Sequence, residues 1–291
     1  MKFVEKEIPE GINVTPHNPL LNFAHLLGTV VVLSIVIFVA LGYIAEWLAS
    51  RLSPETEGKI GQMLMHTVSE EIQEDSRIQY IETLLHSLSE SEEKIRLPLT
   101  VHLIEDEVIN AAIMPGGHVL VHTALLEKVE SENELVFILA HELGHFQARD
   151  SIKSLGRSLV FVTAYLTLGI SSFLEWGGFG DVVPMTEQLA GLHYSRQQEK
   201  TADIYALSKM IKRYGHAGHS LDFFERLDKE SEKSKQLEKV SQYFSTHPSN
   251  PSRINYLNKT AAKNGWNMAG ETTSAKWLQC PDMKECKLAT D

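Results

Sequence analysis

The stretch SENELVFILAHELGHFQARD, residues 131–150, decides how this chain folds. Ser131 followed three positions later by Glu134 is a capping-box pattern, so we predict that a helix begins there. The apolar run at 135–140 carries this helix into the sequence His-Glu-Leu-Gly-His at 141–145. A helix that is apolar on nearly every side is buried, so its polar side chains are expected in the protein interior.

The spacing of His141 and His145 predicts a metal site. Residues four apart lie one above the other on the same helical face, so both imidazoles can bind one metal ion. Glu142 is rotated by about 100° around the helix axis and therefore lies beside the metal rather than on it. There it can take a proton from a metal-bound water and later return it to a leaving amine. The alternative, two histidines that simply fill a core, would bury polar groups at a cost.

A catalytic zinc site needs a third protein ligand and one open position. The residues after His145 supply neither the glycine nor the histidine of the extended H-E-x-x-H-x-x-G-x-x-H pattern, so the third ligand must come from elsewhere. The best candidate is Glu199, in the first turn of a predicted helix. Asp203, one turn later, can hydrogen-bond a ligand histidine and fix its tautomer. The alternative is that this Glu/Asp pair lies on an ordinary helix surface.

Composition limits the class of protein. A chain of 291 residues is long enough for one sizeable catalytic domain with additional segments. Its formal net charge is −11 and it has no basic block that would neutralise phosphates, so we expect no nucleic-acid partner. The two cysteines, Cys280 and Cys286, are far in sequence from the predicted metal helix. Their spacing allows a small disulfide loop, which would form only in an oxidising compartment.

The N-terminal region predicts a membrane anchor. Residues 1–20 are polar and contain three prolines, so we interpret them as an exposed arm. The anchor is assigned to 21–47, because 26–45 contains no charge over a length that spans a bilayer. Tyr43 and Trp47 lie where aromatic residues gather at a membrane surface. A cleaved signal peptide and a buried globular helix are the competing interpretations. Lysine and arginine are balanced on the two sides, so charge does not orient the helix.

Helices and then strands are predicted between this anchor and the metal helix. Residues 48–96 have apolar side chains at three- and four-residue spacing, typical of two amphipathic helices, and are assigned as a helical linker region. Alternation predicts a strand at 97–104. Strands at 108–114 and 118–122 are expected to form a hairpin through the Pro-Gly-Gly turn at 115–117.

An open strand edge near the metal helix suits the binding of a peptide. Extended peptides add to such an edge through main-chain hydrogen bonds. We assign Asn110, Ala111 and Ala112 to the edge, because small residues leave room and the amide can bond a peptide backbone. An ordinary structural strand is the alternative. His118 and His122 alternate on one strand face and are explained adequately as surface or core residues.

The apolar segment 158–174 resembles a second membrane span. A single crossing would place His141 and Glu199 on opposite sides of the bilayer, where they could not share a metal ion. A return crossing is interrupted by the acidic residues and the proline that follow. We therefore predict a buried helix, or a segment that dips into the membrane surface beside the active site.

Two further candidates lie in the C-terminal third. Pro248 ends any helix at His247 and holds that ring in a fixed turn, and Arg253 lies near the start of the next helix. Either side chain can stabilise the oxyanion that forms when water attacks a carbonyl. His247 can alternatively cap the open zinc position in a resting state, and a purely structural turn is the third interpretation. His216 and His219 form a weaker metal candidate in a glycine-containing loop.

Four segments occur in an order that resembles a known family. They are N-A-A-I-M-P-G-G at 110–117, H-E-L-G-H at 141–145, S-R-Q-Q-E-K-T-A-D at 195–203 and T-H-P-S at 246–249. Together they resemble the HtpX-like family of zinc metalloendopeptidases of the gluzincin type, which also includes the CAAX prenyl protease and the Oma-type mitochondrial peptidases. The resemblance covers residues 97–257.

The resemblance implies a role for each matching residue. These are the zinc ligands His141, His145 and Glu199, the general base Glu142, the supporting Asp203, and His247 and Arg253 near the transition state or as a gate. Members of this family are often membrane-embedded and linked to protein quality control. This chain departs from the multi-span members in having one clear span. It is more similar to the single-anchor or periplasmic members that cleave unfolded or misassembled envelope proteins.

We therefore expect an α+β fold, mostly α-helical. A zincin-type metallopeptidase domain at 97–257 with a small β-hairpin or sheet follows one N-terminal transmembrane helix and precedes a polar tail at 258–291. We expect one Zn²⁺ per chain, protein or peptide substrates that are unfolded or membrane-associated, and contact with membrane lipid through the N-terminal helix. The catalytic domain of this single-pass protein is expected on the exported, periplasmic side.

The expected function is that of a membrane-anchored, zinc-dependent endopeptidase. It would hydrolyse peptide bonds with metal-activated water, in quality control of membrane or envelope proteins. One alternative is a proteolytically inactive, zinc-stabilised, chaperone-like interaction module. Another is a zinc hydrolase that acts on small acyl substrates or free N-termini.

Overall fold

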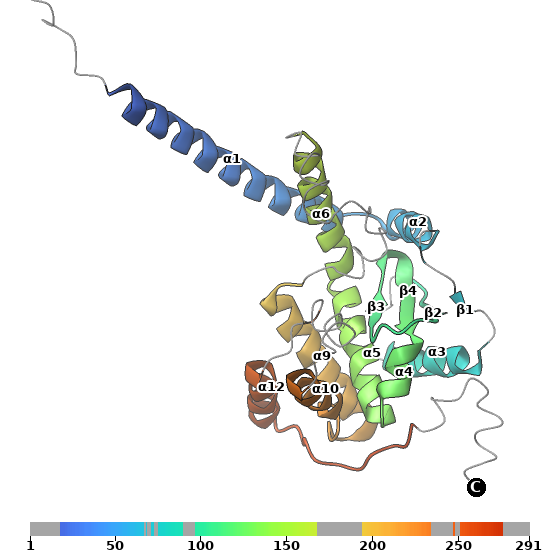
Figure 1. Cartoon of the computed structure of the whole chain (residues 1–291). Helices are drawn as coiled ribbons and strands as arrows, with labels where there is room; N and C mark the ends of the chain where they lie inside the picture. Colours follow the sequence, from blue (N-terminus) through green and yellow to red (C-terminus); the bar gives the residue numbers. More distant parts are fainter. Residues whose placement is uncertain are drawn as a thin grey trace, which may run out of the picture.

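The computed structural model describes residues 18–66, 68, 71–72, 75–89, 97–167, 194–233, 247 and 251–275. Helices surround a small sheet, and one long helix extends away from the body (Figure 1). The predicted α+β, mostly helical class is confirmed. The helices are α1 (Pro19–Ser50), α2 (Pro54–Met65), α3 (Ser76–Ser89), α4 (Thr123–Lys128), α5 (Glu132–Gln147), α6 (Asp150–Thr167), α9 (Arg196–Tyr214), α10 (Asp222–Lys233) and α12 (Pro251–Asn264).

The sheet has the strand order β1-β2-β4-β3. Its strands are β1 (Glu71–Ile72), β2 (Thr100–Ile104), β3 (Ala111–Ile113) and β4 (His118–His122). The hairpin predicted from the Pro-Gly-Gly turn is present, because β3 and β4 are antiparallel and joined by a short 3-10 turn, η1 (Pro115–Gly117). Gly116 and Gly117 have φ angles of 90° and 85°, which only glycine adopts without strain. β2 pairs with β4 in parallel, so β3 forms one edge of the sheet.

Helix α5 is the centre of the main core. Ser131 caps its first turn as predicted, its side chain accepting a hydrogen bond from the backbone of Glu134, and all residues from Glu132 to Phe146 are buried. The helix lies between the sheet and α9 (Figure 1). A Cβ added at Gly144 would lie 2.9 Å from Cα of Ala202, so α5 and α9 are in close backbone contact there.

The region upstream of residue 97 belongs partly to this core. α2 and α3 are the two amphipathic helices expected there, with the short strand β1 between them. α3 contributes four side chains that are almost completely buried in the main core, Ile81, Leu84, Leu85 and Leu88. The C-terminal region also packs on α5, because Ser274 forms an isolated bridge with Ser131 and Ala275 is buried.

Helix α1 has the opposite character. Ala49 is its only buried residue, although the helix is strongly apolar. Among the described residues, it is the single helix long and apolar enough to cross a membrane. Its C-terminal end crosses α6, where a Cβ added at Gly156 would lie 3.0 Å from the carbonyl oxygen of Ala45 and 3.2 Å from Cβ of Ala49.

Arg149 joins the end of α1 to the metal helix. Its φ angle of 60° is unusual for a residue other than glycine, and it lies between α5 and α6. Its guanidinium donates hydrogen bonds to the carbonyls of Ser50 (2.7 Å) and Leu52 (2.9 Å) and pairs with the buried carboxylate of Glu57 at 2.7 Å. The last carbonyl of α1 and that of Leu52 are thus held by Arg149, between α5 and α6.

The segment predicted at 158–174 is described only to Thr167, as the second half of α6. Helix α6 is amphipathic: Ile152 and Leu155 are buried, whereas Leu159 is 52% exposed. Residues 168–174 and the cysteines Cys280 and Cys286 lie outside the described residues.

Candidate active site

Four side chains that are distant in the sequence meet beside α5. These are His141 and His145 on α5, Glu199 in the first turn of α9, and His247; all four are buried, and one ligand atom from each lies within 4.8 Å of the others. The helical spacing brings the two α5 rings together, and the capping box of α9 directs Glu199 toward them. The sequence-based hypothesis placed three of these residues at one metal ion, and their positions are consistent with it.

Neighbouring ligand atoms in this cluster lie close enough to share one metal ion. Nε2 of His145 lies 3.1 Å from Nε2 of His141 and 3.2 Å from Oε1 of Glu199. Nδ1 of His247 lies 3.2 Å from Nε2 of His141 and 3.1 Å from Oε1 of Glu199. Donors that bind one ion at about 2.0–2.1 Å lie within about 4.2 Å of each other. The four contacts above meet this limit, and Nε2 of His141 lies 3.6 Å from Oε2 of Glu199.

Carboxylates behind the two α5 histidines fix the direction of their rings. Nδ1 of His141 lies 2.9 Å from Oδ1 of Asp203, and Nδ1 of His145 lies 3.0 Å from Oδ2 of Asp150. Such carboxylates accept a hydrogen bond from Nδ1–H, which leaves the unprotonated Nε2 as the ligand atom. Two Nε2 lone pairs and a carboxylate then point into the same space, an arrangement that a cation stabilises.

Burial and charge shift the pKa values in this cluster in different directions. Burial lowers the pKa of His141 and of His247. Burial alone would raise the pKa of Glu199, but hydrogen bonds to His145 and His247 hold it well below its usual value. For His145, hydrogen bonds to Asp150 and Glu199 outweigh burial and raise the pKa to about 9. A metal ion that binds here must displace that proton, so its affinity falls as the pH falls.

Glu142 lies beside the ligand atoms and not among them. Its side chain is 1% exposed, and burial raises its pKa to about 7. Its Oε1 lies 3.4 Å from Nε2 of His247 and has no hydrogen-bond partner among the described residues. A buried carboxylate with an uncommitted oxygen and a pKa near neutrality has the properties of a general base.

Arg253 supports the cluster from α12. Its Nε and Nη2 donate two hydrogen bonds, of 2.7 and 2.6 Å, to the carboxylate of Asp203, the residue that orients His141. Its Nη1 lies 3.1 Å from Oε2 of Glu199. This paired guanidinium lowers the pKa of Asp203 against the opposing effect of burial. Arg253 thus contacts two carboxylates of the site in this structure.

Comparison with known proteins identifies the family. The sequence model described as peptidase family M48 matches residues 73–261, more than half of the chain. The chain belongs to peptidase family M48. The resemblance drawn from the four motifs is thereby confirmed, and so is the prediction of a metallopeptidase at the level of the family.

Several curated relatives support the M48 assignment. A putative beta-barrel assembly-enhancing protease of Vibrio cholerae is 30% identical over 184 residues, which are 60% of this chain and 37% of the relative. The mitochondrial metalloendopeptidase OMA1 of Schizosaccharomyces pombe is 31% identical over 162 residues, 53% of this chain and 44% of the relative. OMA1 of Danio rerio is 26% identical over 198 residues, which are 64% of this chain and 41% of the relative. The matches cover less than half the length of each of these relatives.

The strand-edge residues of this M48 chain lie beside α5. Asn110 precedes β3 and Ala111 and Ala112 belong to it, at the edge of the sheet. The carbonyl of Asn110 accepts a hydrogen bond from His122 of β4, so by antiparallel alternation Ala111 and Ile113 direct their backbone groups outward. Oδ1 of Asn110 already accepts the N–H of Ala111. Its amide oxygen therefore supports the edge strand here.

The other histidines named from the sequence, His118, His122, His216 and His219, lie outside the cluster. His118 contacts His102 at 3.0 Å, and His122 pairs with Asp106 at 2.8 Å. His216 accepts a hydrogen bond from Gly218, and His219 pairs with Asp222. Each has a structural partner in the described part of the chain.

Sequence reasoning missed two residues of this site. The sequence pattern gave no role to Asp150, yet its carboxylate lies at hydrogen-bond distance from His145. Tyr194 stacks on the ring of His145, with the ring centroids 3.9 Å apart, and its hydroxyl contacts Ser151 at 3.2 Å. An acidic residue five positions after the second histidine and an aromatic residue just before the Ser195 cap were the available signals.

Proposed function

We propose that this chain is a membrane-anchored, zinc-dependent endopeptidase. The observation that carries the proposal is the convergence of His141, His145 and Glu199 with the uncommitted carboxylate of Glu142 beside them. Imidazole nitrogens and a carboxylate oxygen are donors that zinc prefers. Membership of a peptidase family supplies the reaction class.

Each residue has a distinct task in the proposed mechanism. Zinc, when bound, lowers the pKa of water and polarises the carbonyl to be cleaved. Glu142 accepts a proton from that water and passes it to the leaving amine. Asp203 and Asp150 hold His141 and His145 in the tautomer that exposes Nε2. Arg253 holds Asp203 in place.

His247 occupies the fourth position of the cluster in this structure. Its Nδ1 is as near to Glu199 and His141 as the other ligand atoms are to one another. We infer that this is the resting arrangement and that His247 leaves the position when water and substrate enter. Its second ring nitrogen, near Glu142, then remains available to the reacting carbonyl.

A single substitution tests the chemistry. Glu142→Gln keeps the side-chain shape but removes the base, so casein hydrolysis is expected to fall by about 10²–10⁴-fold. Elemental analysis of the purified variant should still find one zinc per chain. Glu82→Gln, at an exposed position on α3, is the matched control and should cleave normally. Undiminished hydrolysis by Glu142→Gln would exclude this base, and a metal other than zinc would correct the cofactor.

The anchoring and the substrate class rest on other observations. α1 has the length and the exposed apolar surface of a membrane helix. Relatives named as beta-barrel assembly-enhancing and mitochondrial peptidases support substrates among unfolded or misassembled membrane and envelope proteins. We place the catalytic domain on the exported side. Labelling of Cys280 and Cys286 by an impermeant thiol reagent on intact cells, after reduction, tests this orientation; labelling only after lysis would reverse it.

A further inference from the structure

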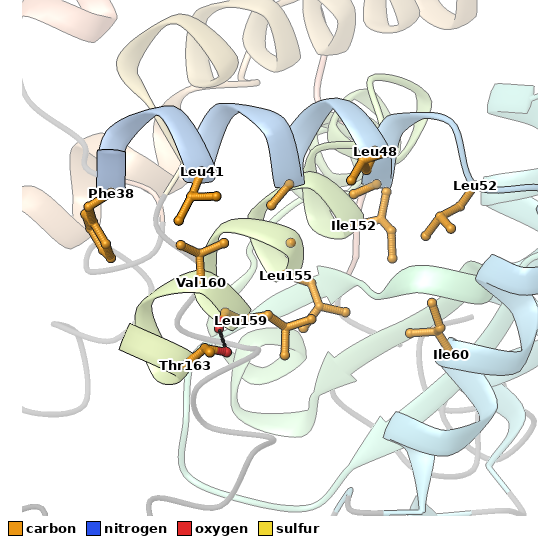
Figure 2. Close-up of a pocket in the computed structure, with 13 residues that line it drawn as sticks. Phe38, Leu41, Leu48, Leu52, Ile60, Ile152, Leu155, Leu159, Val160 and Thr163 are labelled. Carbon is orange, nitrogen blue, oxygen red and sulfur yellow. Dashed lines mark hydrogen bonds between the residues drawn. The ribbon is translucent and has the colours of Figure 1, made fainter. Parts of the chain in front are cut away.

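An apolar groove runs beside the crossing of α1 and α6. Its volume is about 640 Å³, within the range of about 300–1,000 Å³ that small-molecule sites occupy. Figure 2 shows it from Phe38 at one end to Leu52 and Ile60 at the other, with the side chains of both helices pointing into it. Its lining includes Leu41 and Leu48 of α1 and Leu155, Leu159 and Thr163 of α6.

The groove has almost no polar surface. Thr163 carries its only side-chain polar atom, and that hydroxyl donates a hydrogen bond of 2.7 Å to the carbonyl of Leu159 in the preceding turn. An extended peptide that entered the groove would therefore find at most one side-chain acceptor, the Thr163 oxygen, for its backbone groups, and leaving the others unpaired in an apolar site is costly. A hydrocarbon chain needs no such partner.

The position of the groove along α1 also favours lipid. Leu41, Leu48 and Leu159 line it and are still about half exposed, at 47%, 54% and 52%. The groove is therefore continuous with the exposed apolar surface of α1, the surface that a bilayer would cover. Its inner end rests on a second apolar cluster, to which Ile152 and Leu155 of α6 belong.

Polar and aromatic residues mark a membrane surface at the same level. On the other side of the helix crossing, Arg157 of α6 pairs with Glu46 of α1 at 2.7 Å. Tyr43 is 71% exposed on the same stretch of α1, and the guanidinium of Arg51 lies 4.9 Å above the ring of Trp47. Aromatic and basic side chains gather where headgroups meet acyl chains. With α1 in a bilayer as proposed, the Phe38 and Leu41 end of the groove lies on the acyl side of that boundary, and the Leu52 and Ile60 end lies on the headgroup side (Figure 2).

We infer that this groove holds an acyl chain of a membrane phospholipid between α1, α6 and α2. The inference rests on the proposed anchoring of α1 and adds a lipid site outside the peptidase centre. It gives α6, which begins at the carboxylate that orients His145, a direct contact with the bilayer. The segment predicted to dip into the membrane surface would do so by this face.

Photolabelling of the full chain tests the site. The protein is reconstituted in phosphatidylcholine vesicles that contain a small share of phosphatidylcholine with a diazirine at the end of one acyl chain. After illumination, labelled peptides are mapped by mass spectrometry. We expect label on α1 and on the α6 peptide with Leu159 and Thr163. The same lipid with the diazirine on its headgroup should label that α6 peptide much less and the α2 peptide with Ile60 more.

A matched pair of variants makes the test specific. Leu159→Asn places an amide in the groove, whereas Ile44→Asn makes the same change at an equally exposed position, 52%, on α1 outside it. Losing the apolar contact of one leucine side chain weakens binding by about tenfold, so Leu159→Asn should reduce α6 labelling by the acyl-chain probe by that order. Ile44→Asn should leave it unchanged. Zinc content and the thermal unfolding midpoint report whether each variant is folded.

The outcomes separate this inference from the proposed function. Label on α1 with none on the α6 peptide would overturn the lipid site and leave the anchoring intact. Equal labelling of this peptide in Leu159→Asn and the wild type, or equally strong labelling of it by the headgroup probe, would also overturn it. Absence of label from α1 would remove the anchoring and the lipid site together, without affecting the peptidase centre.

Discussion

The metal cluster and the crossing of α1 with α6 are built on opposite principles. In the cluster, buried charged and polar side chains from α5, α9 and α12 are paired at hydrogen-bond distance. The single guanidinium of Arg253, for example, contacts the carboxylates of both Asp203 and Glu199. At the crossing, small residues bring two helices together at Gly156, and the surrounding surface is apolar and open. The first region depends on specific partners, because an unpaired buried charge is costly. The second depends mainly on shape and hydrophobicity, with one half-buried ion pair, Arg157 with Glu46, on its other side.

Removal of Arg253 should break the first region most severely. Arg253→Ala leaves the carboxylate of Asp203 buried and without its guanidinium, and loss of one member of a buried pair costs about 3–5 kcal/mol. Chemical denaturation of the metal-free protein measures this loss. Arg253→Lys keeps the charge but not the two-bond geometry, so its free energy of unfolding should lie between those of Arg253→Ala and the wild type. A loss below about 0.5 kcal/mol in Arg253→Ala would mean that the pair is not formed in solution.

Substitution of Asp150 tests how far the orientation of the His145 ring contributes to metal affinity. Asp150→Asn removes the charge that holds the Nδ1 proton of His145, so metal affinity should fall by about 10–100-fold. Competition with a chelator measures the affinity. Asp222→Asn is the control, because Asp222 makes a similar contact, of 2.7 Å, with the exposed His219 outside the cluster. Equal metal affinity in the two variants would assign Asp150 to structure alone.

Gly156 probes the crossing by shape. An added Cβ would meet Ala45 and Ala49 at 3.0 and 3.2 Å, whereas the same atom at Gly28 of α1 meets nothing within 4 Å. Alanine raises helix propensity at both positions, so the difference between Gly156→Ala and Gly28→Ala isolates the close approach. We expect Gly156→Ala to be less stable by about 1–3 kcal/mol in detergent, with unchanged metal affinity. A change in metal affinity would show that the two regions are coupled.

A smaller effect is expected at the other end of α5, where Glu132 accepts hydrogen bonds from Tyr80, Tyr214 and Arg213. Burial alone would raise its pKa, but these bonds hold the pKa of Glu132 below its usual value. The folded state therefore binds this proton less readily than the unfolded state, whose glutamate titrates near pH 4.3, and the stabilisation is lost as the pH falls below about 4.

Glu132→Gln checks that pH dependence. The variant should be less stable than the wild type by about 1 kcal/mol at pH 7, and the difference should shrink as the pH falls below about 4. Urea denaturation at a series of pH values measures both. A difference that stays constant down to pH 3 would contradict a lowered pKa.

The sequence predicted the elements of this fold better than their contacts. The N-cap at Ser131, the Pro-Gly-Gly turn and the apolar helix α1 each depend on local residue chemistry, and each is present in the structure. The capping box at Ser131 is only half formed, because the Glu134 side chain accepts the N–H of Glu130 instead of that of Ser131. The parallel pairing of β2 with β4 was not predicted, because nothing within either strand specifies its neighbour. The same holds for Gly156, which has no periodic signal and acts only through the helix that crosses it.

The site divides in the same way. The helical spacing of His141 and His145 puts both rings on one face, so their meeting could be predicted from local geometry. Glu199 and His247 could be nominated but not placed, because their approach depends on how α9 and the turn at His247 pack on α5. Asp150 was missed because its contact with His145 depends on the left-handed backbone at Arg149. That conformation turns the chain from α5 into α6.

Arg149 holds the carbonyls of Ser50, the last residue of α1, and of Leu52, so the end of α1 is tied to the catalytic body. With α1 in a bilayer as proposed, the metal cluster would lie at a fixed height above the lipid. The distance of a bond from the membrane would then restrict which bonds reach the cluster, alongside any preference for side chains.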